Sequence, residues 1–186
     1  GLSAGDSLTL YDLICGLLLQ SGNDCAAAIA EHISGSQEAF AELMNTEAKQ
    51  LGATGTHFVN PHGLHDENHY TTTYDLYLMF NEALKDQAFL DIISMNSYTA
   101  KVTSADGTSY TPTWQATNYY SAGEATPPDG IHVYGGKTGT TDQAGNCVIL
   151  YEKNTAGEPY ISVIMGASDK PLLYEEMNEL LDAGMK

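Results

Sequence analysis

The chain has 186 residues, and 42% of them are hydrophobic, which is enough to bury the core of one globular domain. Its formal net charge at pH 7 is −17, and its seven lysine and arginine positions are all lysines. Because such a surface repels phosphate, we expect no nucleic-acid partner and no direct adhesion to anionic lipid.

The first half of the sequence predicts helices. Thr-x-x-Asp capping boxes begin two of them, at Thr9 and Thr72, and Ser36 begins a third as its N-cap. Apolar residues at helical spacing follow each of these starts. The expected helices cover residues 9–19, 25–33, 36–51, 72–84 and 89–93. Polar residues 20–24 fit an ordinary turn between two helices, with Asn23 or Asp24 as the N-cap of the second helix.

The second half predicts a sheet followed by a helix. From about residue 96 the apolar period changes toward two, which is typical of strands. The expected strands cover residues 97–102, 108–114, 146–152 and 160–165, with loop at 121–130 and a final helix over 169–184. This order predicts an α+β fold, an antiparallel sheet packed against a helical cluster. The helical part would span about residues 8–93, and the sheet with the final helix about 94–186.

A lone lysine lies among glycines and threonines at residues 135–141, just before the two most strand-like runs. Glycine in a strand allows another backbone to approach closely. Lys137 and its neighbouring threonines offer a positive charge and hydroxyl donors to whatever docks there. The pattern fits a substrate-binding strand, and a glycine-rich hairpin with an exposed lysine is the alternative.

Four of the six histidines gather in the longest irregular stretch, residues 53–71, at His57, His62, His65 and His69. A long ordered loop is typical of a binding or catalytic task. The cluster raises a zinc hypothesis, but the histidines have no helical register and no cysteine or glutamate pair joins them. We therefore expect no metal and no cofactor. Cys15 and Cys147 fall in an apolar helix and a strand, which favours buried free thiols.

Two short motifs that lie far apart in the sequence resemble motifs of a known protein family. Ser21-Gly22-Asn23 and Lys137-Thr138-Gly139 match the second and third of the three motifs of penicillin-binding proteins and serine β-lactamases. Residues 17–24, 56–64 and 136–141 all resemble the low-molecular-mass penicillin-binding, serine-type D-alanyl-D-alanine carboxypeptidases of the peptidase S11 type. The resemblance implies a β-lactamase/transpeptidase-like fold that acts on peptidoglycan stem peptides through an acyl-enzyme.

The resemblance also implies roles for individual side chains. Ser21 would relay a proton toward the leaving nitrogen, since a hydroxyl both donates and accepts. Asn23 would bind the substrate amide and the family's catalytic lysine. Lys137 would supply positive charge near Ser21 and the substrate carboxylate.

The remaining implied roles belong to the strand and to the loop. The stretch Thr138-Gly139-Thr140 would take the substrate as an added strand, with the Thr140 N–H as an oxyanion donor and both threonine hydroxyls near the carboxylate. His62 matches a family segment thought to help water attack the acyl-enzyme, and a purely structural loop histidine is the alternative.

Two departures from the family pattern stand out. No serine in the chain is followed three residues later by lysine, so we expect a domain incomplete at its N terminus that lacks its nucleophile and is inactive alone. The family often places arginine near the substrate carboxylate, where this chain has Tyr119 and Leu173. Carboxylate recognition would then depend on Lys137, the threonines and Lys170.

The expected partners are stem peptides ending in D-Ala-D-Ala, β-lactams for the intact domain, and a second copy of the chain through an open sheet edge. The expected location is the bacterial cell envelope, outside the cytoplasm. Two alternatives stay open, a non-catalytic peptidoglycan- or partner-binding module and a class A β-lactamase-like hydrolase.

Overall fold

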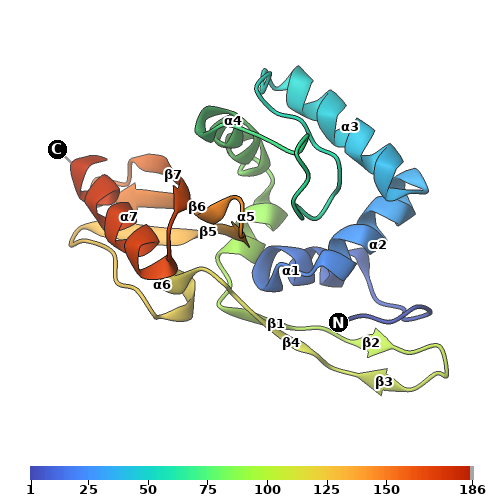
Figure 1. Ribbon diagram of the computed structural model, residues 1–186. Helices are drawn as coiled ribbons and strands as arrows, with labels where there is room; N and C mark the ends of the chain where they lie inside the picture. Colours follow the sequence, from blue (N-terminus) through green and yellow to red (C-terminus); the bar gives the residue numbers. More distant parts are fainter. Residues whose placement is uncertain (185–186) are drawn as a thin grey trace.

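Three antiparallel strands in the order β5-β6-β7 carry helices on both faces, in a computed structural model that describes residues 1–184 (Figure 1). The strands of this sheet are β5 (Ile131–Thr141), β6 (Gly145–Asn154) and β7 (Pro159–Ala167). The helices are α1 (Leu10–Gln20), α2 (Asn23–Ser34), α3 (Gln37–Gln50), α4 (Thr73–Ala83), α5 (Gln87–Ile93), α6 (Tyr119–Ala122) and α7 (Lys170–Gly184). The α+β prediction is confirmed.

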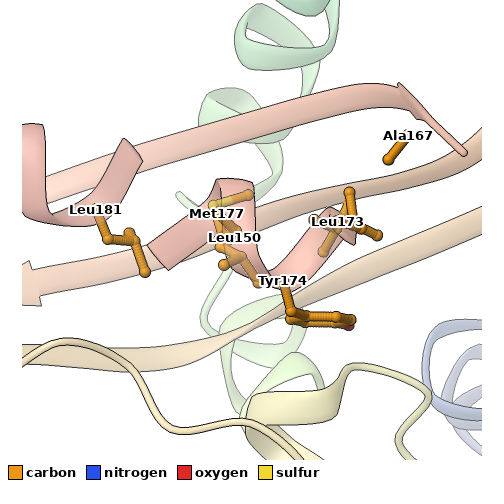
Figure 2. Close-up of a cluster of buried hydrophobic side chains, with 7 residues drawn as sticks. Leu150, Ala167, Leu173, Tyr174, Met177 and Leu181 are labelled. Carbon is orange, nitrogen blue, oxygen red and sulfur yellow. The ribbon is translucent and has the colours of Figure 1, made fainter. Parts of the chain in front are cut away.

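Alternation along β6 divides the core between the two faces of the sheet. Val148 and Leu150 point to one face and pack against α7, in the cluster that Figure 2 shows around Met177. Ile149 points to the other face and packs with Phe80 of α4 and with α5. Because α4 and α5 cover the sheet, the helical and sheet parts of the chain share one core, and their division near residue 93 stays a prediction.

A close approach of α5 to β5 depends on the absence of a side chain at Gly135. A Cβ there would lie 1.9 Å from the carbonyl oxygen of Ile93, and one at Gly136 would lie 2.0 Å from the carbonyl oxygen of Ile149. These distances are far inside van der Waals contact, so the two glycines let helix and strand backbones approach closely.

Two of the predicted helix starts are confirmed in atomic detail. Thr9 and Asp12 form the reciprocal capping box, and the Ser36 hydroxyl accepts the N–H of Ala39. At Thr72 only half of the predicted box forms, because the carboxylate of Asp75 accepts a hydrogen bond from the Thr56 hydroxyl instead. The carboxylate thus ties α4 to the long loop before it.

The predicted hairpin forms an extended arm at the side of the molecule (Figure 1). Its strands are β1 (Ser97–Thr99), β2 (Val102–Thr103), β3 (Ser109–Tyr110) and β4 (Thr113–Gln115), paired as β1-β4 and β2-β3. Each predicted strand is broken in the middle, where Pro112 lacks the N–H that a continuous ladder needs. Trp114 packs against α1 and secures the base of the arm.

Three other expectations need correction. The N-cap of α2 is Gly22, not Asn23 or Asp24, and it offers no side-chain cap. Cys147 is half-buried, whereas Cys15 is buried as expected. The short helix α6 (Tyr119–Ala122) extends over the first two residues of the loop predicted at 121–130. Among residues 1–184, no helix has the length and apolar character needed to cross a bilayer.

Candidate active site

A cleft of about 470 Å³ opens where the α1–α2 junction, the long loop before α4 and strand β5 converge. All seven residues that the sequence singled out line it: Ser21, Asn23, His62, Lys137, Thr138, Gly139 and Thr140. Apolar side chains of the loop and of α1 and α3 complete the wall, namely Leu17, Met44, Phe58 and Leu64. The fold thus brings together residues from three separate parts of the chain.

Ser21 ends α1 in the left-handed conformation, with φ 58° and ψ 41°. It is the one non-glycine residue with positive φ among residues 1–184, and such a backbone costs about 1 kcal/mol or more for an L-residue. The N–H of Gly22 donates to the Gly16 carbonyl and closes the end of the helix. The turn exposes the side chains of Ser21 and Asn23 on the cleft side.

Lys137 reaches Ser21 across the cleft. Its Nζ donates to the Ser21 Oγ at 2.8 Å and to its neighbour's carbonyl, that of Thr138, at 2.6 Å. Burial lowers the pKa of the Lys137 ammonium to about 8, because desolvation penalises the charged form. This half-buried ammonium has two neutral acceptors and no anionic partner among residues 1–184, so the site favours a negatively charged ligand.

Both threonine hydroxyls of the strand have partners at its side. The Thr138 Oγ1 lies 2.7 Å from the Thr117 Oγ1, and the Thr140 hydroxyl donates to the Asn146 Oδ1 at 3.2 Å. The side chain of Thr140 is exposed and that of Thr138 is half-buried. Neither Thr117 nor Asn146 was singled out by the sequence, because both contacts depend on how strands and loops pack.

Asn60 shapes the segment that carries His62. Its Oδ1 accepts the N–H groups of His62 and Gly63, and its Nδ2 donates to the Leu64 carbonyl. The sequence contains one signal for this turn, the Asn60-Pro61 dipeptide, because Asn-Pro favours turn initiation. The amide of Asn60 therefore fixes the shape of the turn that carries His62 through three local hydrogen bonds.

Two of the loop histidines accept hydrogen bonds from the backbone. The His62 Nδ1 accepts the N–H of Leu64 at 3.2 Å, and the His69 Nδ1 accepts the N–H of Val59 at 3.1 Å. Burial lowers the pKa of both imidazoles, so both favour the neutral form that this acceptor role requires. Over residues 1–184 we find no group of three or more histidine, cysteine or acidic side chains placed to hold a metal ion.

The two positions where the resemblance leads us to expect arginine have different surroundings. Leu173 is buried in the core between α7 and the sheet, and Tyr119 stacks on Tyr174 with ring centroids 4.5 Å apart. The Lys170 ammonium lies over the Tyr119 ring, 5.5 Å from its centroid. Lys137 is the one cationic side chain among the described residues that line the cleft.

Comparison with known proteins places this geometry in a family. The family model described as D-alanyl-D-alanine carboxypeptidase, peptidase S11, matches residues 1–169. The D-alanyl-D-alanine carboxypeptidase DacF of Bacillus subtilis strain 168 is 31% identical over 181 residues, which cover 97% of this chain and 44% of that protein. DacC of Escherichia coli K12 is 31% identical over 186 residues, 100% of this chain and 43% of that protein. This chain therefore spans less than half the length of these two relatives.

Solved structures show the same fold. The crystal structure of the Streptomyces K15 DD-transpeptidase superposes with a TM-score of 0.88 at 29% identity, covering 99% of this chain and 70% of that one. The D-alanyl-D-alanine carboxypeptidase from Mycobacterium tuberculosis H37Rv superposes with a TM-score of 0.85 at 28% identity, covering 100% of this chain and 67% of that one.

Proposed function

Because the chain belongs to the D-alanyl-D-alanine carboxypeptidase family, we propose that it forms most of a serine-type domain that removes the terminal D-alanine from peptidoglycan stem peptides. The observation that carries the proposal is the 2.8 Å contact between the Lys137 Nζ and the Ser21 Oγ, two residues 116 positions apart in sequence. Both belong to motifs that the reaction needs in one cleft.

The nucleophile comes from outside these 186 residues. No serine in the chain is followed three positions later by lysine, and acyl transfer requires an activated nucleophile. A segment bearing Ser-x-x-Lys would place its serine and lysine beside Ser21 and Asn23. Without that segment, the chain should neither release D-alanine nor form a covalent adduct with a penicillin.

Ser21 relays the proton that the leaving group needs. When the nucleophile's oxygen attacks the carbonyl carbon of the penultimate residue and the C–N bond breaks, the departing D-alanine nitrogen must gain a proton. The Lys137 ammonium donates to the Ser21 Oγ, so the serine's own proton is free to point into the cleft. Ser21 can then pass it to the nitrogen and regain a proton from the nucleophile side.

Strand β5 binds the peptide. Gly139 and Thr140 are exposed at the edge of the sheet, where an extended peptide can add as a further strand. The Thr140 N–H would donate to the oxyanion, and the Thr138 and Thr140 hydroxyls with Lys137 would hold the terminal carboxylate. Asn23, exposed on the opposite wall, would hold the substrate amide.

His62 orients water rather than removing its proton. In the neutral ring the Nδ1 accepts the Leu64 N–H, so the proton lies on Nε2. That nitrogen is a donor in this tautomer and cannot act as the base. It can hold a water by its oxygen next to the acyl-enzyme, which supports the hydrolysis step through position alone.

The intact domain would bind β-lactams as substrate mimics and act in the cell envelope, outside the cytoplasm, where stem peptides are found. The proposed chemistry uses side-chain and backbone groups of the protein.

The outer edge of β7 (Pro159–Ala167) is a second docking edge. It has no strand partner among the described residues, and unpaired edges pair with other strands. We propose that two copies of this chain associate through it. Small-angle scattering should show a dimer at high protein concentration, and a monomer at all concentrations would contradict this pairing.

The main proposal is tested by extending the chain at its N terminus with the preceding segment of its gene, provided that segment encodes Ser-x-x-Lys. The extended protein should be labelled covalently by a fluorescent penicillin and should release D-alanine from a D-Ala-D-Ala peptide. Ser21→Ala in the extended protein should slow both reactions at least about 100-fold. An extended protein that binds the peptide without labelling or release would support a binding module instead.

A further inference from the structure

Thr117 connects the two halves of the cleft. It lies between β4 and α6, and its hydroxyl meets the Thr138 hydroxyl with 2.7 Å between the oxygens. Its backbone N–H donates to the carbonyl of Leu19 at 3.2 Å, two residues before Ser21. Thr117 thus touches both the end of α1 and the substrate strand.

The segment that carries Thr117 is held firmly against α7. Asn118 is 2% exposed, and its side chain caps α6 by accepting the Tyr120 N–H. The Tyr119 N–H donates to the Tyr174 hydroxyl at 2.9 Å, and the two rings stack in parallel. Because these contacts fix the backbone on the C-terminal side of Thr117, its hydroxyl is presented to Thr138 in one place.

The chemistry of the ligand decides the direction of the hydroxyl pair. A hydroxyl has one proton to donate, and a carboxylate can only accept. When a carboxylate binds at Thr138, the Thr138 proton must go to the carboxylate, so Thr117 must donate to the Thr138 Oγ1. A carboxamide imposes no such direction, because its NH₂ group can donate to the Thr138 oxygen.

We propose that Thr117 is a positioning residue that commits the Thr138 hydroxyl to donate into the cleft, and thereby sets the preference for a peptide with a free terminal carboxylate. The inference rests on the proposed function. The inference deepens the proposed function by naming how a chain without arginine selects a carboxylate. Lys137 needs help in this role, because two protons of its ammonium already go to Ser21 and to the Thr138 carbonyl. Aligned hydroxyls polarise one another, so the second hydroxyl strengthens the first as a donor.

Equilibrium binding to the 186-residue chain tests the proposal. A ¹⁵N-labelled protein is titrated by NMR with an acyl-D-Ala-D-Ala peptide and, separately, with the same peptide carrying a C-terminal carboxamide, and the shifts of the Gly139 and Thr140 amides are followed. Three proteins are compared: wild type, Thr117→Val, which keeps the shape without the hydroxyl, and Thr117→Ser, which keeps the hydroxyl.

Thr117→Val should weaken binding of the carboxylate peptide about five- to tenfold, the size expected for one hydrogen bond between two neutral hydroxyls. It should change binding of the carboxamide peptide less than twofold, and Thr117→Ser should restore the wild-type preference. Equal weakening of both peptides by Thr117→Val would overturn the inference, since a structural tether between α1 and β5 acts on both alike. An unchanged preference would overturn it too. A wild-type chain that binds neither peptide would contradict the proposed function, and this inference with it.

Discussion

Lys137 and Glu152 are two charged groups on neighbouring strands, the first half-buried and the second buried, and they differ in what surrounds them. The Lys137 ammonium sits in the cleft, donates to two oxygens, and has its pKa lowered to about 8 by burial. Glu152 is 1% exposed on the α7 side of β6, where its Oε1 accepts from the Ser162 hydroxyl at 2.6 Å. Its Oε2 has no hydrogen-bond partner among the described residues, and burial raises the pKa of this carboxyl to about 7.

The difference shows that a shifted pKa does not by itself mark a functional site. Both groups pay for desolvation, but only Lys137 faces a space that a ligand of opposite charge can enter. Glu152 is enclosed between the sheet and α7, and nothing in the structure explains why a carboxyl occupies that position. The cleft charge is a binding element, whereas the enclosed charge only lowers stability above its pKa.

Both charged groups depend on strand β5, which carries Lys137 and pairs with the strand that carries Glu152. Gly135→Ala should disrupt the packing of α5 on β5, because the new Cβ would lie 1.9 Å from the Ile93 carbonyl oxygen. We expect a loss of about 3 kcal/mol or more in unfolding free energy, measured by urea denaturation. Gly139→Ala is the control on the same strand, where a Cβ meets nothing within 4 Å. Equal stability of the two variants would contradict the close packing of α5 on β5.

Lys137→Met tests the cleft side of the comparison. Removing the one cation should weaken binding of an acyl-D-Ala-D-Ala peptide about 100-fold, as truncating one partner of a buried charge pair does. Stability at pH 7 should not fall, because the variant no longer desolvates a charge. Lys170→Met is the matched control because Lys170, which the sequence led us to expect in carboxylate recognition, does not line the cleft and has its ammonium over the Tyr119 ring. A similar loss in both variants would argue against a specific role for Lys137.

Local hydrogen bonds were predictable from the sequence. The caps at Thr9 and Ser36 form because each joins groups three residues apart. At Thr72 the Asp75 N–H still donates to the Thr72 hydroxyl, but the Asp75 carboxylate accepts from the distant Thr56 hydroxyl instead of completing the box. Tertiary contacts override a local pattern when they offer the same atom a better-placed donor.

The site was predictable only as far as its motifs. The resemblance singled out Ser21 and Lys137, but the hydroxyl pair of Thr117 with Thr138 arises from packing, and no spacing in the sequence reports it because its partners come from separate elements. The left-handed backbone of Ser21 and the bond from the Leu64 N–H to His62 are local, but neither belongs to a motif that singled these residues out.

Glu152→Gln tests the enclosed side. The folded-state pKa of this carboxyl is raised from 4.5 to about 7, so the folded protein binds the extra proton between these pH values. The cost of ionising it therefore appears as the pH rises through this window and is complete above it. The variant should be more stable than wild type by about 1–3 kcal/mol at pH 8 and about equal to it at pH 5.

Thermal denaturation at the two pH values measures this difference. Glu179→Gln, at an exposed position on α7, is the control and should be as stable as wild type at both pH values. A Glu152→Gln variant that is less stable than wild type at pH 8 would mean that the ionised carboxyl has a favourable partner, and the contrast with Lys137 would then fail.

The smallest predicted effect is the pH dependence of peptide binding. The pKa of Lys137 in the free protein is about 8, so the ammonium is mostly charged at pH 7 and mostly neutral at pH 9. A bound carboxylate favours the charged form, hence affinity should fall about tenfold between these pH values. The two cleft imidazoles, with pKa values lowered by burial, titrate below this range and contribute nothing to it. Residual binding to Lys137→Met should be flat over the same interval, and a wild-type affinity that stays constant to pH 9 would mean that Lys137 does not hold the carboxylate.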